Sequence, residues 1–118
     1  MIDEQGILGM VGLCRRAGKT VIGTDMVCDH LRARSQKRGD GNNKNAGETE
    51  ILVLEGADTS ENTHKKISDK CIYYNVKHIR LNSSCAALGK AVGKRATAAV
   101  AIADASFCRA ILGRLEEN

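Results

Sequence analysis

Hydrophobic positions follow two different patterns along this chain. Near the N-terminus Ile7, Val11 and Cys14 recur at intervals of four and three residues, which places them on one face of a helix. Residues 51–54 and 98–102 are instead continuous apolar runs, the pattern of strands that are buried on both faces. Because the two patterns alternate along the chain, they predict alternating helices and strands.

Glycine, asparagine and N-capping residues must mark the helix ends, because the chain contains no proline. Gly18 and Gly93 are expected to end helices, since glycine enters the left-handed region without steric cost, and Asn75 tolerates the same conformation. Residues with a side-chain oxygen are expected to cap the helices that follow them. These predicted N-caps are Thr24, Asp58 in a capping box with Glu61, Ser83 or Ser84, and Asp104.

These boundaries define the expected order of helices and strands. Helices are expected at 2–17, 24–34, 58–74, 84–92 and from 104 onward, and strands at 21–22, 51–54, 78–81 and 98–102. Strands that alternate with helices favour a central sheet covered on both faces. The predicted fold class is therefore α/β, a three-layer α/β/α sandwich with a four-stranded, mostly parallel (mixed) sheet.

Residues 35–49 differ from the rest of the chain. The segment is rich in glycine and asparagine, lacks periodicity and contains no large apolar residue, so it is expected to be a flexible surface insertion. Its bases Lys37, Arg38 and Lys44 could serve as a basic arm, but a tolerated loop is the favoured interpretation. A chain of 118 residues is expected to form one domain, 1–118, that carries this insertion.

Positive charge is concentrated in the middle of the chain. Residues 15–95 contain 16 basic and 9 acidic residues, a net charge of +7, while the two ends together carry 2 basic and 5 acidic residues, a net charge of −3. A basic middle suits a polyanionic partner such as nucleic acid. Taken alone, however, the charge favours a solvated surface.

The overall composition favours a cytoplasmic protein. A content of 42% hydrophobic and 27% charged residues is ordinary for a soluble globular domain. No apolar run approaches the length of a membrane span, and a start that contains Asp3 and Glu4 is unlike a signal peptide. The five cysteines form no C-x-x-C pair and are expected to be buried thiols in a reducing compartment.

Motifs for catalysis and for cofactors are absent or incomplete. The sequence Gly18-Lys19-Thr20 matches the end of a phosphate-binding loop, but Leu13 stands where that motif requires glycine. There is no dinucleotide-binding fingerprint and no G-x-S-x-G motif. We therefore expect no enzyme, no catalytic residue, no cofactor and no small-molecule substrate.

The histidines and cysteines leave one enzymatic hypothesis open. His30, His64 and His78 lie far apart and share no metal-ligand spacing, so no metal site is expected. Cys71 could act as a nucleophile beside a histidine that is distant in the sequence. Its spacing of four residues from Ile67 favours a position in the core instead.

Residues 17–31 combine the features of an anion-binding corner. A helix ends, a short strand passes, and the next helix begins at Thr24 beside a basic cluster, which consists of Arg15, Arg16 and Lys19. The first N–H groups of a helix lack partners within the helix and carry partial positive charge, which suits phosphate. We expect the protein to contact RNA at this corner.

Two carboxylates lie on the helix that begins at this corner. Asp25 and Asp29 stand at i and i+4, where they could act as general acid and base if burial shifted a pKa. The favoured role of Asp25 is to complement the positive N-terminus of its helix.

Several segments, in order, resemble a known family. GLCRRAGK at 12–19 and GTD at 23–25 resemble the ribosomal protein L-seven-Ae superfamily. Further segments resemble its bacterial YlxQ-type branch; these are 58–66 (DTSENTHKK), 69–74 (DKCIYY), 88–94 and 99–102. The resemblance covers the chain except 35–49, where the family usually has a tight connection.

The resemblance implies an RNA-binding protein that recognises kink-turns, which are bent RNA helices with tandem sheared G·A pairs. It also implies a role at the ribosome or a likeness to a ribosomal protein, with ribosomal RNA as one candidate partner. In the family the N-terminus of the second helix enters the RNA major groove, and the loop after the fourth helix packs on an extruded nucleotide. The residues expected to contact RNA are therefore Lys19, Gly23, Thr24, Asp25, Met26, Arg32, Lys94, Arg95 and Ala96.

Three positions depart from the archaeal members of the family. Asp25-Met26 stands where they carry Asn-Glu, and Asp29 stands where they carry lysine. A carboxylate near phosphates opposes binding, and Arg32 and Arg34, a turn further on, could compensate for it. The alternative hypothesis is a protein-interaction module on the same fold that has lost strong kink-turn binding, which predicts an exposed apolar patch in place of a basic face.

Overall fold

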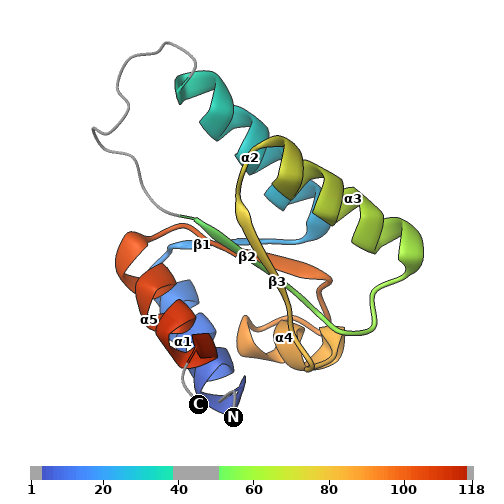
Figure 1. Ribbon diagram of the computed structural model, residues 1–118. Coiled ribbons are helices and arrows are strands. Elements are labelled where there is room, and N and C mark those ends of the chain that lie inside the picture. Colours follow the sequence, from blue (N-terminus) through green and yellow to red (C-terminus); the bar gives the residue numbers. More distant parts are fainter. Residues whose placement is uncertain (1–3, 39–50, 117–118) are drawn as a thin grey trace.

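The computed structural model describes residues 4–38 and 51–116, apart from the side chains of 36–38 and 116, as a sheet with helices on both faces (Figure 1). The helices are α1 (Glu4–Arg16), α2 (Thr24–Arg38), α3 (Glu61–Tyr73), α4 (Cys85–Ala91) and α5 (Ala105–Glu116). The strands are β1 (Thr20–Ile22), β2 (Leu52–Glu55), β3 (Lys77–Arg80) and β4 (Ala99–Ile102). The predicted α/β fold class and the predicted order of elements are confirmed.

The sheet is mixed, with the strand order β1-β4-β2-β3. Strands β1, β2 and β3 run in the same direction, whereas β4 runs against them between β1 and β2. The mixed sheet is confirmed, but "mostly parallel" describes strand directions and not pairs, because only β2 and β3 form a parallel pair. The place of β4 depends on contacts between distant segments, which local sequence patterns do not report.

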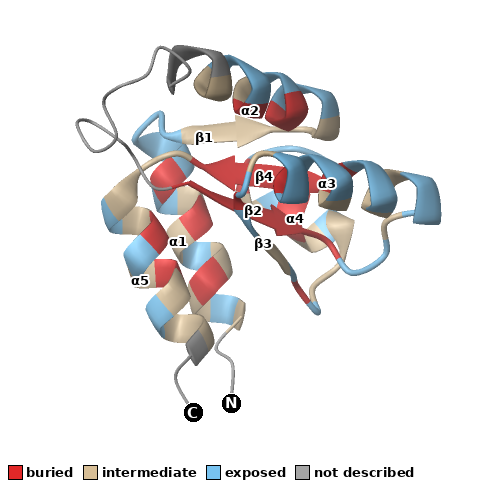
Figure 2. Cartoon of the chain, turned by 45° about the horizontal axis from the view of Figure 1, so that its top comes forward, coloured by how far each residue is buried: buried red, intermediate tan, exposed pale blue. Residues whose placement is uncertain are grey.

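Two hydrophobic cores lie on the two faces of the sheet (Figure 2). In β2, Leu52 and Leu54 pack with α1, α4 and α5, while Val53 packs with Val27 of α2 and Ile67 of α3. This alternation follows from the two-residue period of a strand. Burial on both faces explains the continuous apolar runs, since each fully buried aliphatic side chain contributes about 1.5–3 kcal/mol.

Most helix ends form where they were predicted. Gly18 and Gly93 have φ of 76° and Asn75 has φ of 57°, all in the left-handed region. Ser84 accepts a hydrogen bond from the Ala87 N–H at 3.1 Å, and Asp104 accepts one from the Phe107 N–H at 3.0 Å. These ends are decided by local chemistry, which explains why the sequence predicts them.

Two predicted N-caps were wrong. Gly23, and not Thr24, caps α2, because its carbonyl accepts the first helical hydrogen bond from Val27 N–H at 2.9 Å. Ser60, and not Asp58, caps α3. The Asp58 carboxylate instead accepts a hydrogen bond from the Cys85 N–H at 2.7 Å, so it braces the start of α4.

The predicted insertion at 35–49 falls mostly outside the described residues. Its first part was predicted wrongly, because 35–38 continue α2 as regular helix. Among the described helices, none is both long and apolar enough to cross a bilayer.

Candidate functional site

The structure brings the start of α2 next to the loop that precedes β4. The Gly23 N–H donates a hydrogen bond to the Ala99 carbonyl at 2.9 Å, where β1 ends and β4 begins. Gly23 has φ of 102°, a conformation that favours glycine and turns the chain from β1 into α2. Two segments separated by about 70 residues of sequence therefore meet at one end of the sheet, which we call the loop end.

The first turn of α2 presents backbone donors at the loop end. The helical ladder begins with Val27, so the N–H groups of Thr24, Asp25 and Met26 precede it. A glycine cap has no side chain that could accept bonds from these groups. Asp25 and Met26 in this turn are exposed, and Met26 has 59% of its surface accessible to solvent.

The loop 93–98 is held tightly although its charged side chains are exposed. The Lys94 N–H bonds to the Gly89 carbonyl at 2.8 Å, and the Thr97 N–H bonds to the Cys85 carbonyl at 3.0 Å. A Cβ built on Gly89 would lie 2.4 Å from Ala96 Cα, so the loop packs directly on α4. Lys94, Arg95 and Ala96 are exposed on this fixed backbone.

The electrostatics of this loop are positive. In the part of the chain that the structure describes, neither Lys94 nor Arg95 takes part in an ion pair. Arg15, at the end of α1, adds a third base, because its Cζ lies 3.3 Å from the position of a Cβ on Gly93. Arg15 was counted in the basic cluster but not among the expected RNA contacts, because its closeness to Gly93 arises only when α1 packs on α4.

A lysine from α3 neutralises the carboxylate at the start of α2. Lys66 Nζ lies 2.7 Å from Asp25 Oδ1, and both side chains are at least half exposed. The hydrogen bond from Lys66 and its positive charge lower the pKa of Asp25. The same hydrogen bond and the negative charge of Asp25 raise the pKa of Lys66. Asp25 is therefore one member of an ion pair at this site. The sequence did not predict the pair, because its two residues are 41 positions apart.

Two of the expected site residues lie away from the loop end. Lys19 precedes β1, and four extended residues, about 13 Å of chain, separate it from Gly23. Arg32 is eight residues into α2, about 12 Å along the helix axis, and lies 3.9 Å from Asp29. The structure therefore brings together Gly23, Thr24, Asp25, Met26, Lys94, Arg95 and Ala96, but not Lys19 or Arg32.

The structure does not support the nucleophile hypothesis for Cys71. Burial, followed by the neighbouring Cys28 and Glu55, raises the pKa of Cys71 to about 12, so the thiol stays protonated at neutral pH. The structure also does not support a general acid and base role for Asp25 and Asp29. Both carboxylates are exposed on α2, so the burial that this role requires is missing.

Sequence spacing missed a second group of polar side chains. His64 and His78 both contact the buried carboxylate of Glu55, with nitrogen to oxygen distances of 2.9 Å and 2.7 Å. The three residues stand on α3, β3 and β2, so only the packed fold unites them. One signal was available, since Glu55 ends an apolar run that otherwise predicts a buried strand.

Two curated proteins that are similar to this chain are both named RNA-binding protein YlxQ. The chain is 36% identical over 107 residues to the RNA-binding protein YlxQ of Bacillus subtilis (strain 168), covering 91% of this chain and 92% of that protein. It is 30% identical over 92 residues to the RNA-binding protein YlxQ of Enterococcus faecium, covering 78% and 75%. No family model matches the chain.

Two solved structures share the fold over nearly the whole chain. A protein of unknown function from Bacillus halodurans matches with a TM-score of 0.74 and 25% identity, covering 94% of this chain and 97% of that one. The Giardia lamblia 15.5kD RNA binding protein matches with a TM-score of 0.65 and 18% identity, covering 96% and 87%.

Proposed function

The chain belongs to the family of the RNA-binding protein YlxQ, and on that basis we propose that it binds structured RNA at the loop end of its sheet. The observation that carries the proposal is the hydrogen bond from Gly23 to Ala99, which joins the first turn of α2, whose glycine cap has no side-chain acceptor, to the basic loop 93–98. Both segments are those that the family resemblance assigns to RNA.

Each segment supplies a different kind of contact. The N–H groups of Thr24, Asp25 and Met26 can donate to phosphate or to base edges, because helix N-termini favour anions. Lys94 and Arg95 neutralise backbone phosphates and release counterions. Arg15 extends this charge along the same surface, since its guanidinium rests on the turn at Gly93.

The preferred RNA in this proposal is a kink-turn. A helix tip and a loop fixed side by side match a sharply bent duplex, which offers a groove and a phosphate backbone at the bend together. The chain has one Phe, two Tyr and no Trp, so it has few aromatic side chains on which unpaired bases could stack. Recognition of a folded shape therefore fits better than recognition of single strands, and ribosomal RNA is one source of such bends.

The protein-interaction alternative has weaker support. It requires a broad exposed apolar patch, and among the described residues the large exposed apolar side chains are scattered over three helices. They are Leu13, Met26, Ile72 and Tyr73. Exposed apolar residues in such small numbers are normal on a protein surface.

A mobility-shift titration tests the proposal, with a kink-turn duplex compared with a straight duplex of equal length. We expect the wild-type protein to bind the kink-turn at least about tenfold more tightly. Lys94→Glu combined with Arg95→Glu is expected to weaken that binding at least roughly 100-fold, because two attractive contacts become repulsive. Circular dichroism should show the same helix content in both proteins.

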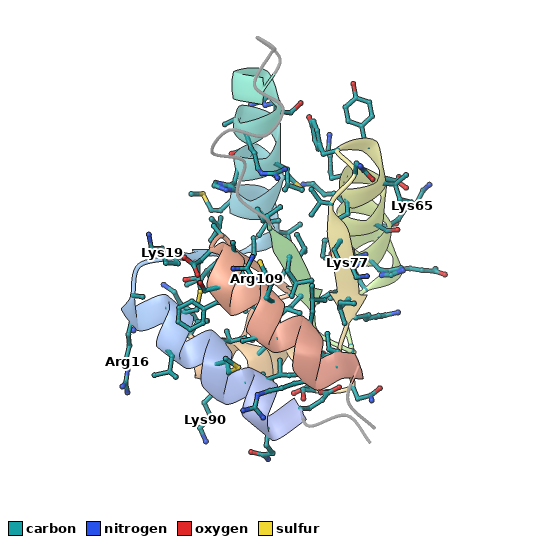
Figure 3. The ribbon with its side chains drawn as sticks, turned by 60° about the vertical axis from the view of Figure 1, so that its left-hand side comes forward. Arg16, Lys19, Lys65, Lys77, Lys90 and Arg109 are labelled. Carbon is teal, nitrogen blue, oxygen red and sulfur yellow. The ribbon has the colours of Figure 1, made fainter. Side chains whose placement is uncertain are left out.

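The matched control reverses two charges at the other end of the sheet. Lys19 precedes β1 and Lys77 begins β3, and because both strands run in the same direction, both lysines lie at the end of the sheet opposite the loop end (Figure 3). Lys19→Glu combined with Lys77→Glu changes the net charge by the same amount as Lys94→Glu combined with Arg95→Glu. We expect this control to retain most of the affinity. Equal losses in the two double variants would mean that only the net charge matters, and equal affinity for both RNAs would remove the kink-turn from the proposal.

A further inference from the structure

Glu55 is a charged residue in the interior of the sheet. Its side chain is 0% exposed at the end of β2, and it points to the α2–α3 face because it is two residues from Val53. A buried carboxylate is costly unless charged or hydrogen-bonding partners surround it. The partners of Glu55 therefore indicate what the position is built to hold.

Two histidines approach this carboxylate from different elements. His64, in the first turn of α3, places Nδ1 2.9 Å from both carboxylate oxygens, and His78 of β3 places Nε2 2.7 Å from Oε1. The parallel register of β2 and β3 pairs Val53 with His78 and Glu55 with Arg80, which puts all four on one face. One nitrogen of each ring and a carboxylate oxygen lie within 4.8 Å of one another.

We propose that Glu55, His64 and His78 form a binding site for a divalent transition-metal ion of the zinc type. Two imidazoles and one carboxylate are a donor set that zinc, nickel and copper ions prefer and that magnesium and calcium ions do not. Bonds of about 2.0–2.2 Å in a tetrahedral site set neighbouring donors roughly 3.4 Å apart. The two nitrogen–oxygen separations here are 2.9 Å and 2.7 Å, and all three donor atoms lie within 4.8 Å, so small side-chain movements would bring them to that spacing.

Binding requires only a small change in protonation. Each ring must turn a lone pair toward the ion, so the proton of a neutral ring moves to its other nitrogen, and a cationic ring releases one proton to solvent. The ion would replace the two N–H···O contacts with one bond to each ring nitrogen and one bond to a Glu55 carboxylate oxygen.

The surrounding residues hold the carboxylate and leave an entrance. Thr59 Oγ1 donates to Glu55 Oε2, and Arg80 Nη2 donates to Thr59 Oγ1 and to the Ala57 carbonyl at 3.1 Å each. Such outer contacts orient metal ligands and raise metal affinity. The side chain of His64 is 36% exposed, so an ion can reach the donors from solvent without opening the core.

The charge balance sets the kind of site. Arg80 Nε lies 3.6 Å from Glu55 Oε2, and a guanidinium near a dication lowers its affinity. Three protein ligands leave at least one coordination position for water, whereas closed structural zinc sites have four protein ligands. We therefore expect an open, exchangeable site and not one on which folding depends.

Calorimetric titration of the metal-free full chain with Zn²⁺ tests the proposal. We expect one ion per chain in the wild type, with the dissociation constant raised at least about tenfold in His64→Gln, in His78→Gln and in the Thr59→Ala variant that loses an outer contact. His30→Gln, a histidine on α2 outside the cluster, is the matched control and should bind as the wild type does. Glu55→Gln should abolish binding. If that buried substitution prevents folding, His64→Gln still tests the site, because the His64 side chain is 36% exposed and its replacement leaves the core intact.

Two spectroscopic measurements separate this site from the five cysteines. Co²⁺ bound to the wild type should give d–d bands without thiolate charge-transfer absorption, and nitrogen-detected NMR should show changes at His64 Nδ1 and His78 Nε2 on addition of Zn²⁺. The proposal is overturned if Zn²⁺ and Co²⁺ fail to bind, if His64→Gln and His78→Gln bind as tightly as the wild type, or if thiolate bands dominate the cobalt spectrum. In those cases the cluster would be a hydrogen-bond network alone.

Discussion

At the scale of single residues, Lys66 decides how the first turn of α2 presents its charge. Asp25 would place a bare carboxylate among groups that we propose contact phosphate, and Asp29 lies one turn further on. Lys66 reaches Asp25 from α3 at 2.7 Å, and its charge also interacts with Asp29. We propose that Lys66 on α3 supplies the positive charge that the archaeal members of the resembled superfamily carry on the second helix.

The Asp25–Lys66 pair leads to a prediction about pH. Because the pKa of Asp25 is lowered from 3.8, the pair stabilises the folded state above pH 3.8, and this is lost as pH falls through the lowered pKa. The raised pKa of Lys66 makes the pair fully effective below pH 10.5 and ineffective once pH rises through that raised value. In Lys66→Met we expect the pKa of Asp25 to return toward 3.8, measured by NMR titration of its carboxyl carbon.

A matched variant checks the cause of this shift. Lys65, the neighbour of Lys66, lies 3.6 Å from Asp69 and not at Asp25, so Lys65→Met should leave the Asp25 titration unchanged. An Asp25 pKa that stays lowered in Lys66→Met would assign the shift to the helix N-terminus and remove Lys66 from its role.

At the scale of elements, α4 and the loop that follows it form one unit. The loop 93–98 carries the proposed phosphate contacts, and α4 positions it through Gly89, whose lack of a side chain lets Ala96 approach. A close approach of the same kind joins α1 to α4, where a Cβ on Gly12 would lie 3.2 Å from the Ala91 carbonyl oxygen. The position of the basic loop thus depends on glycine at packed helix faces.

Gly89→Ala should displace the loop. A new Cβ would lie 2.4 Å from backbone atoms of Ala96, which cannot turn away as a flexible side chain does. We expect the steric clash to lower the free energy of unfolding by about 1–3 kcal/mol. The higher helix propensity of alanine offsets roughly 1 kcal/mol of this loss. The free energy of unfolding, measured with denaturant, and the RNA affinity, measured by mobility shift, should both be lower than in the wild type.

Gly9→Ala is the control for this change. Gly9 also lies within a helix, and a Cβ there would meet no atom within 4 Å. This variant should gain up to about 1 kcal/mol of stability from helix propensity and bind RNA normally. A stable Gly89→Ala protein with unchanged RNA affinity would contradict the view that α4 sets the loop.

At the scale of the whole molecule, the directions of the four described strands bring the proposed RNA surface and the proposed metal site to the same end of the sheet. Strands β1, β2 and β3 end there and β4 begins there, so Gly23, Glu55 and the loop 93–98 lie together (Figure 1). Gly23 and Glu55 flank Ala99 on opposite sides, about 10 Å apart across two strand spacings. The proposed RNA surface and the proposed metal site are therefore neighbours with separate ligands.

Salt dependence tests the proposed surface as a whole. Neutralising a base that contacts phosphate should make the plot of log affinity against log salt less steep by about one. We expect this change in Lys94→Met and in Arg95→Met, and no change in Lys19→Met, since Lys19 lies at the opposite end of the sheet. Mobility-shift titrations at several salt concentrations measure the slopes, and the same slope in all four proteins would argue against the assigned surface.

The sequence by itself determined the elements and most of their ends. The left-handed residues Gly18, Asn75 and Gly93 and the cap Ser84 act on neighbours a few residues away, so they can be predicted without knowing the fold. Core positions on helices were also predicted, because apolar residues such as Ile67 and Cys71 recur at the period of their helix and are both buried. Of the two site segments, the first turn of α2 was chosen first from its helix N-terminus and the nearby bases, and the loop 93–98 was chosen only through the family resemblance.

Only the tertiary structure decided which distant residues meet. The insertion of β4 between β1 and β2, the bond from Asp58 to Cys85, the pairing of Lys66 with Asp25, and the gathering of two histidines on Glu55 all join residues from different elements. Their physical cause is the packing of two helical layers on one sheet, which brings each side chain to partners that no spacing along the chain reveals.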